Sequence, residues 1–401
     1  MLLASAINKL LMTHRFSIFT LASLLLLVCV GTSAKKRTFN EAKAIAQRQA
    51  TSLGATLSSA SIETARRLNA PSVSGGSLAY YVFPHDRGKG FTIVSGDDQL
   101  PEIVAYSDRG SYDVAHLPDG YKMFLELYSD MVDELAQGHP SAMQAVSQAQ
   151  RRAQTKAARP VVTPLLGDRM WNQYAPFNNL CPMDGTNPTV TGCVATALAQ
   201  VFAYWRFPEA LLVDIPAYTT YTKRLKVPAI ASGEPYDWDR MLDIYEEGYY
   251  SQEEADAVAK LMLHCGAALQ MDYTSSSSGA NIFLAKLTKY FGYDAETMQE
   301  LERDHYSLEE WMDLLDAELQ AKRPVLYSGS SSTVGHQFVC DGSDGDGLYH
   351  INWGWGGYQD GYFDITLLNP DKGGAGSGSD ADGYTKGCRA IIGIQPGDGA
   401  V

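Results

Sequence analysis

Residues 191–205 read TGCVATALAQVFAYW, and this stretch decides the fold of the larger part of the chain. Its apolar residues recur at the spacing of one helix face, at Val194, Leu198, Val201 and Trp205. Pro208 follows shortly afterwards and ends the run. The pattern therefore predicts a helix with Gly192 and Cys193 at its start.

The position of Cys193 at a helix start favours a thiolate. Unpaired backbone N–H groups and the positive end of the helix dipole lower the pKa of a thiol placed there. Because a thiolate attacks carbonyl carbons, Cys193 is a candidate nucleophile. On this stretch alone, the alternative is an inert buried thiol, since cysteine is among the most buried residue types.

Such a nucleophile needs a base, and His336 has the most suitable setting among the eight histidines. It opens a strand-like run, HQFVCDG, which a turn of sequence SDGDG connects to a second run, LYHIN. An antiparallel hairpin of this kind would bring Asn352 near His336, where the amide oxygen would accept the imidazole N–H. His350 is an alternative base, but it shares a strand face with Asn352 and is interpreted as a packing residue.

The first 34 residues have the pattern of a signal peptide. A basic start is followed by an apolar run over 16–30 and by small residues up to Ala34. The run is short for a membrane span. We therefore expect an exported protein, secreted, periplasmic or at the cell surface, with no membrane attachment after signal removal.

Residues 35–136 are predicted to form one small unit, ahead of a linker and a larger domain. The small unit is expected to contain helices near 41–53 and 121–136 and strands near 78–83 and 90–95. Residues 137–160 have almost no large apolar side chains and are interpreted as an exposed linker that proteases cut. Residues 161–401 hold most of the tryptophans and form the larger domain, so a mature protein is expected to start near Val161.

The formal net charge of −14 is unevenly distributed. Residues 1–159 carry 17 Lys and Arg against 13 Asp and Glu, a net charge of +4, which leaves −18 for residues 160–401. This balance argues against a nucleic-acid partner and lets the two halves attract each other, although chance variation of surface charge is the plainer alternative.

Five cysteines remain after the predicted signal, and they do not have the spacing of a metal site. An odd number leaves at least one thiol outside any intrachain disulfide. The sequence has no CxxC pair and no tight Cys/His cluster. We therefore expect no metal and no cofactor.

Together, these segments resemble the streptopain family of secreted bacterial cysteine proteases. The resemblance rests on GCVATA at 192–197, GHQFV at 335–339 and YHINWGWGG at 349–357, and shorter matches before and between these segments fit the family in order. In the front unit, GFTIVSGDD at 90–98 resembles the inhibitory propeptide of that family.

The resemblance implies an α+β fold, with a papain-like two-part catalytic domain behind a small α+β prodomain. It implies a self-processing zymogen that hydrolyses peptide bonds in proteins, with its own prodomain as intramolecular inhibitor. Cys193 would be the nucleophile, His336 the general base and acid, and Gln173 an oxyanion donor. Asn352 and Trp353 would support His336. Ser277, Ser278, Gly279 and Gly335 would line the substrate cleft.

Plainer interpretations of these residues, and two other functions, stay open at this point. Gln173 would otherwise be a surface residue in a polar loop, and residues 275–280 a flexible surface loop. One other function is an exported binding or inhibitor protein on an inert copy of the fold. The other is a thiol acyltransferase, which shares the Cys–His chemistry.

Overall fold

The computed structural model describes residues 36–57, 72–73, 77–117, 119–139, 159–330, 335–364 and 388–397. The predicted signal peptide lies outside these residues, as does nearly all of the predicted linker, at 140–158. Within the described part of the chain, every helix is too short or too polar to serve as a transmembrane span.

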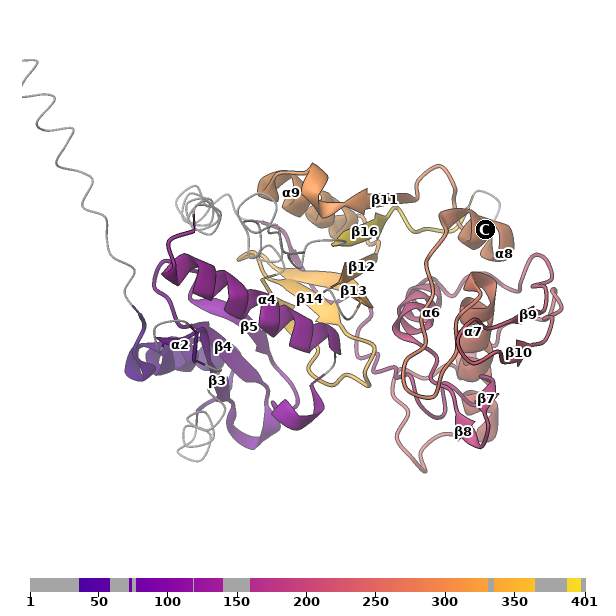
Figure 1. Ribbon diagram of the computed structural model, residues 1–401, viewed down its shortest axis with the longest axis horizontal. Helices are drawn as coiled ribbons and strands as arrows, with labels where there is room; N and C mark the ends of the chain where they lie inside the picture. The colour runs from indigo at the N-terminus through magenta and orange to yellow at the C-terminus, as the bar shows by residue number, and fades with distance from the viewer. Residues whose placement is uncertain are drawn as a thin grey trace, which may run out of the picture. The chain divides into compact units, whose positions relative to one another are not determined.

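One ten-stranded sheet organises the structure (Figure 1). Nine strands are hydrogen-bonded in a continuous order and β6 (Val161–Val162) pairs separately with β13. The order is β11 (Gln299–Glu302), β16 (Arg389–Ile392), β12 (Val325–Ser330), β13 (Gly335–Asp344), β14 (Tyr349–Asn352), β15 (Gly361–Phe363), β5 (Ile103–Ser107), β4 (Phe91–Ser95) and β3 (Tyr80–Pro84). Every pairing is antiparallel.

The sheet joins the front unit to the larger domain through β5 and β15. Tyr362 pairs with Tyr106 and Phe363 pairs with Ala105. The sequence analysis predicted one small unit over 35–136 and placed no strand at 103–107. The structure adds β5 there and continues the small β3–β4–β5 meander into the main sheet, because β5 has a hydrogen-bonding edge that β15 occupies.

The two faces of the sheet pack against different helices. Neighbouring residues on a strand point to opposite faces, so Leu326 and Val339 contact one apolar core while Tyr327 and Phe338 contact the other. The first core includes α6 (Cys193–Trp205), α7 (Gln252–Leu269) and α8 (Leu284–Phe291). The second includes α4 (Asp119–Ala136) and α9 (Leu308–Gln320), and Figure 1 shows α4 lying across the strands.

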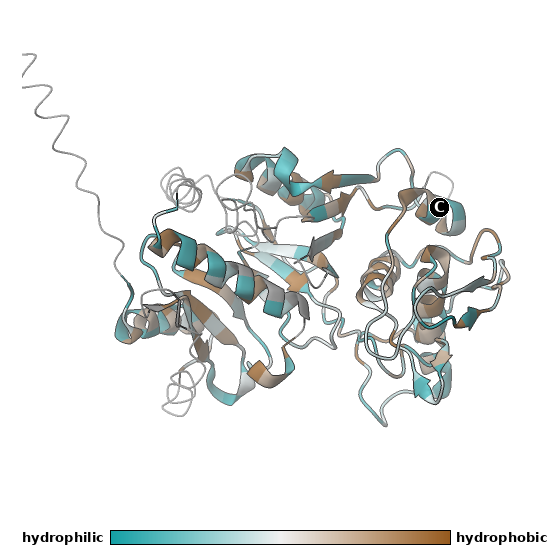
Figure 2. Cartoon of the chain, in the orientation of Figure 1, coloured by the Kyte–Doolittle hydropathy of each residue, from teal (hydrophilic) through white to brown (hydrophobic). Residues whose placement is uncertain are grey.

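Local sequence explains where the helices begin. Ser251 and Ser307 cap α7 and α9 as capping boxes with Glu254 and Glu310, as their Ser-x-x-Glu spacing predicts. Thr38 does the same for α2 (Phe39–Ser52), which covers the front strands with its own small core. Figure 2 shows α6 as largely hydrophobic, in keeping with a helix that is buried on almost every side.

Short elements complete the described chain. The two-stranded sheets are β1 (Ser72–Val73) with β2 (Ser77–Leu78), β7 (Met183–Asp184) with β8 (Asn187–Pro188), and β9 (Tyr218–Thr219) with β10 (Lys226–Val227). Single 3₁₀ turns lie at η1 (Asp86–Gly88), η2 (Val114–His116), η3 (Trp238–Arg240) and η4 (Arg303–His305).

Candidate active site

The helix α6 begins at Cys193, as its sequence predicts. Gly192 occupies the N-cap position with a φ of +84°, which glycine adopts without a steric penalty. A Cβ atom at position 192 would lie 2.6 Å from the carbonyl oxygen of Ser278. The helix start therefore requires glycine, both for its backbone conformation and for the close approach of the loop that contains Ser278.

Cys193 and His336 line one cleft of about 710 Å³. Cys193 reaches it from the start of α6 and His336 from the second residue of β13. The predicted residues Gln173, Ser277, Ser278, Gly279 and Gly335 line the same cleft. Asn352 and Trp353 lie behind His336 and are not part of the lining.

The electrostatic surroundings favour the thiolate form of Cys193. Burial alone would raise the pKa of this thiol, but the charge and hydrogen bond of His336, together with two backbone N–H groups, outweigh burial and lower it. The backbone N–H groups of Gln337 and Val194 act in the same direction. Among the described cysteines, Cys193 is the one whose thiol pKa lies below its ordinary value, because burial raises the pKa of Cys181, Cys265, Cys340 and Cys388.

A backbone carbonyl orients the imidazole of His336. Its Nε2 atom lies 3.1 Å from the carbonyl oxygen of Trp353 and donates a hydrogen bond to it. This bond leaves Nδ1 as the ring nitrogen available to the thiol. The Trp353 indole is fully buried, and its ring centroid lies 6.2 Å from that of His336.

The side-chain amide of Asn352 is engaged elsewhere, contrary to the contact that the hairpin suggested. The hairpin forms, but its register pairs Asn352 with Val339, three residues beyond His336. The amide oxygen accepts from Gly354 N–H and from Gln200 Nε2, each at 3.0 Å, and Nδ2 donates to Arg169 O at 2.9 Å. The Trp353 carbonyl therefore occupies the place beside Nε2 that was expected for the Asn352 amide.

A buried carboxyl group fixes the other side of Trp353. Asp360 Oδ1 accepts the Trp353 N–H at 2.9 Å. Burial raises the pKa of Asp360 to about 7, against the lowering effects of this bond and of His350. His350 itself pairs with Asp341 at 2.6 Å and lies outside the cleft, which agrees with a packing residue.

Gln173 is held against the start of α6. Its carbonyl oxygen accepts from Thr191 N–H at 3.1 Å, and its own N–H donates to Asn172 Oδ1 at 2.7 Å. The side chain is mostly buried, not on the open surface, and lines the cleft beside Cys193. This position suits a donor directed at an oxyanion near the thiol.

The loop over 274–279 forms another wall of the cleft, and its serines differ in accessibility. Ser277 is exposed, whereas Ser278 is buried and its hydroxyl donates to Val190 O at 2.7 Å. Ser278 therefore braces the loop against the segment that precedes Cys193. Gly279 is exposed, and no heavy atom lies within 4 Å of the position that its Cβ would occupy.

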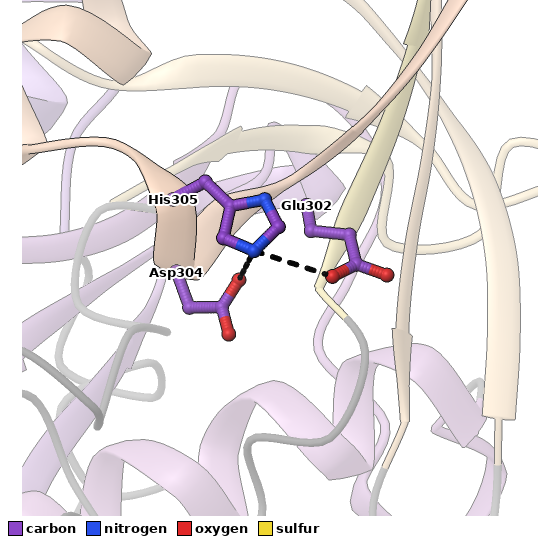
Figure 3. A group of neighbouring side chains, drawn as sticks. All are labelled: Glu302, Asp304 and His305. Carbon is purple, nitrogen blue, oxygen red and sulfur yellow. Dashed lines mark ion pairs between the residues drawn. The ribbon is translucent and has the colours of Figure 1, made fainter.

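One cluster in the described residues has metal-ligand side chains. Figure 3 shows Glu302, Asp304 and His305 gathered around β11 and η4, with His305 Nε2 at 3.7 Å from Glu302 and 3.9 Å from Asp304. All three side chains are substantially exposed, and Glu302 also pairs with Arg389 at 3.3 Å. These contacts describe a surface ion-pair group, and we assign no metal to it.

The chain is similar over most of its length to known thiol proteases. Streptopain of Streptococcus pyogenes is 34% identical over 348 residues, which cover 80% of this chain and 83% of streptopain. The model of the Peptidase C10 family matches residues 171–363 and that of the Spi protease inhibitor matches residues 34–132. The chain belongs to the Peptidase C10 family.

Other relatives of this C10 peptidase agree. The thiol protease/hemagglutinin PrtT of Porphyromonas gingivalis is 31% identical over 79% of this chain, which spans 37% of PrtT. The match to a fragment of Prevotella intermedia prointerpain A covers 79% of this chain and 95% of that fragment, with 30% identity and a TM-score of 0.61. The match to active Prevotella intermedia interpain A covers 60% of this chain and 97% of interpain A, with 36% identity and a TM-score of 0.50.

These findings confirm the fold and the class of activity that the sequence suggested. The C10 peptidase is a cysteine protease with an inhibitor-like prodomain, on a papain-like α+β fold. Sequence reasoning missed Asp360 and Gln200, which both contact the segment that holds His336. Neither has a sequence signal of its own, because an Asp in a turn and a Gln inside an apolar helix are common without a role in a site.

Proposed function

We propose that Cys193 and His336 carry out peptide-bond hydrolysis in the cleft. The Cys193 thiolate attacks the scissile carbonyl, and His336 then protonates the leaving amine. His336 next activates a water molecule, which releases the acyl-enzyme. Each step needs the thiol and the imidazole side by side, as they lie in the cleft.

Gln173 and the Cys193 N–H are proposed to hold the developing oxyanion. Gln173 lines the same cleft as the thiol, and the Cys193 N–H is at the N-terminus of α6. An oxyanion donor of this kind is typically worth about 3 kcal/mol of transition-state stabilisation. Gln173→Ala is therefore expected to lower kcat by roughly a hundredfold while leaving KM nearly unchanged.

The observation that carries this proposal is the lowered pKa of a half-buried thiol that shares a cleft with a histidine. The test is hydrolysis of casein by the processed protein in the presence of a reductant. Loss of hydrolysis after iodoacetamide treatment, with one label on Cys193, is the expected result. Hydrolysis that continues with Cys193 fully alkylated would exclude the thiol as nucleophile.

We further propose that processing occurs within 137–160, on the N-terminal side of Arg159. Two contacts support this position. Arg159 is bound to the carboxylate of Asp316, and Pro160 O accepts from Ser343 Oγ at 2.7 Å. A cut before Arg159 keeps both contacts in a mature enzyme that starts close to Val161. Intact-mass measurement of the processed protein tests this. An N-terminus beyond Arg159 would contradict the proposed position, and one beyond Gln173 would also remove the proposed oxyanion donor.

The prodomain is proposed to inhibit its own catalytic domain for as long as it stays bound to it. The hydrogen bond from Ser107 Oγ to Asp360 O, at 2.7 Å, supports this inhibition because the Asp360 side chain also accepts the Trp353 N–H.

Export through the predicted signal peptide at 1–34 is also part of the proposed function. When both forms are expressed in a bacterial host, we expect the full-length protein to be exported and a form without residues 1–34 to stay inside the cell.

A further inference from the structure

Gln200 connects the nucleophile helix to the segment that holds His336. It lies on α6 seven residues after Cys193, two helical turns along the same face. Its side chain is completely buried, and Nε2 donates to Asn352 Oδ1 at 3.0 Å. Asn352 Oδ1 also accepts a hydrogen bond from Gly354 N–H. Because an amide oxygen only accepts hydrogen bonds, the side-chain nitrogen of Gln200, and not its oxygen, must face Asn352 Oδ1.

The next link is a single peptide group. The Gly354 N–H that donates to Asn352 and the Trp353 carbonyl that accepts from His336 belong to one planar unit. A hydrogen bond at the N–H end polarises the peptide and strengthens the carbonyl as an acceptor. The orientation of the His336 ring therefore depends on the position of this peptide group, which is hydrogen-bonded to Asn352 and, through Asn352, to Gln200.

Packing brings the same groups together. Gly354 has a φ of +70°, and a Cβ atom there would lie 3.1 Å from Thr196 Cγ2 and 3.8 Å from Gln200 Nε2. The backbone at Gly354 thus rests directly on α6, between the turns of the helix that contain Thr196 and Gln200. Arg169 strengthens the arrangement, since its carbonyl accepts from Asn352 and its guanidinium donates to Gln200 O at 3.1 Å.

We propose that Gln200 is a positioning residue for His336, acting through Asn352 and the Trp353–Gly354 peptide. The relay ties the helix that carries Cys193 to the carbonyl that orients the imidazole, and so sets the geometry between thiol and ring. This inference rests on the proposed roles of Cys193 and His336. Gln200 touches neither substrate nor the reacting atoms and is not itself catalytic.

The test compares Gln200→Leu, Gln200→Glu and Asn352→Leu with the wild-type protein. Each precursor is processed in trans by a trace of wild-type enzyme, so that failure to self-process does not prevent measurement. Gln200→Leu is expected to lower kcat about tenfold, the effect of one lost hydrogen bond, with KM changed by less than about twofold. The pH at which iodoacetamide alkylation of Cys193 reaches half its maximal rate is expected to rise.

Gln200→Glu separates positioning from simple packing. At high pH the ionised carboxylate of this variant places a second acceptor against Asn352 Oδ1, and only its protonated form offers a donor there. Activity relative to wild type is therefore expected to recover as the pH falls. A relative activity independent of pH would contradict the relay.

Two further comparisons keep the inference falsifiable. The double variant Gln200→Leu/Asn352→Leu is expected to lose no more than the worse single variant, because both remove the same bond. Val201→Ala, a core truncation one residue along α6, is expected to lower Tm while leaving kcat and the alkylation profile unchanged. Additive losses in the double variant would overturn the proposal.

The alkylation profile distinguishes this inference from the proposed function. A wild-type protein without peptidase activity would refute the function, but the profile would still report on the relay. An active wild type whose alkylation profile is unchanged in Gln200→Leu would refute the relay alone.

Discussion

Burial alone would make the thiol of Cys193 as inert as the other described cysteines. Burial raises the pKa of Cys388 to about 11 and that of Cys181 to about 12, whereas Cys193 is half-buried and lies beside an imidazole and backbone N–H groups. The difference in reactivity therefore comes from specific neighbours of the sulfur atom.

Replacement of Cys193 or His336 by Ala is expected to leave an unprocessed precursor. The nucleophile and the base act as one unit, so loss of either removes most of the rate, roughly a thousandfold or more. Gel electrophoresis of purified protein under reducing conditions measures this. Cys265→Ala, a thiol buried in α7, is the matched control and should still be processed. Self-cleavage of pure Cys193→Ala would contradict the assignment.

Asp360 makes the stability of the fold depend on pH. Its pKa is about 7 in the folded protein and near 3.8 in the unfolded chain, so the folded state holds a proton that the unfolded state releases. The free energy of unfolding therefore falls as the pH rises from about 4 to about 7. The groups that face Asp360 are His350, Asp341 and Arg109.

Asp360→Asn is expected to remove much of that fall. Asn keeps an oxygen acceptor for the Trp353 N–H but does not ionise. The variant should be more stable than wild type at pH 8, by about 4 kcal/mol, and nearly equal to it at pH 4. Urea unfolding at the two pH values measures this. Equal stability differences at both pH values would show that Asp360 does not titrate in this range.

At the scale of elements, the sequence predicted what local chemistry determines. The capping boxes of α7 and α9 and the apolar face of α6 specify helices through contacts within a few residues. The strand β5 was missed although its sequence, IVAYS at 103–107, has strand-forming residues, and β15 is three residues long. Their pairing depends on a contact between segments about 250 residues apart, which no local pattern encodes.

The error at Asn352 has a similar origin. The hairpin was predicted correctly, but its register places Asn352 opposite Val339, three residues beyond His336, and β13 also contains an irregularity between Cys340 and Gly342. A shift of this kind changes which side chains lie opposite each other. Sequence therefore identified the segment behind His336 but not the atom of that segment that contacts the ring.

Gly192→Ala is expected to damage the start of α6. Alanine at a φ of +84° is strained, and its Cβ would meet the carbonyl oxygen of Ser278 at 2.6 Å. We expect a loss of about 1–3 kcal/mol in stability and a strong reduction in processing, because Cys193 is displaced with the helix start. Thermal unfolding and intact mass measure the two effects. Gly185→Ala, at a φ of +65° with open space around it, is the control for strain without a clash.

At the scale of the whole chain, one core spans the prodomain and the catalytic domain. Tyr121 and Phe124 of α4 pack edge-on against Phe363, and Tyr121 also contacts Trp353. Tyr106 stacks on Tyr362 across the β5–β15 pair, with ring centroids 4.9 Å apart. The ion pair between Arg109 and Asp168 is exposed and contributes little by comparison. Apolar contacts and strand pairing therefore hold the two parts together.

The final prediction is that Tyr121 keeps the cleaved prodomain bound. Wild-type protein whose linker has been cut should elute from a sizing column as one complex with low peptidase activity, and added salt should weaken the complex only slightly. Tyr121→Ala removes a fully buried ring, a change worth about 3–5 kcal/mol in a core, and should release the prodomain and raise the initial rate. Tyr121→Phe is the matched control, because no described residue contacts the buried hydroxyl by a hydrogen bond. If Tyr121→Ala elutes and hydrolyses peptide as the wild type does, the shared core is not what retains the prodomain.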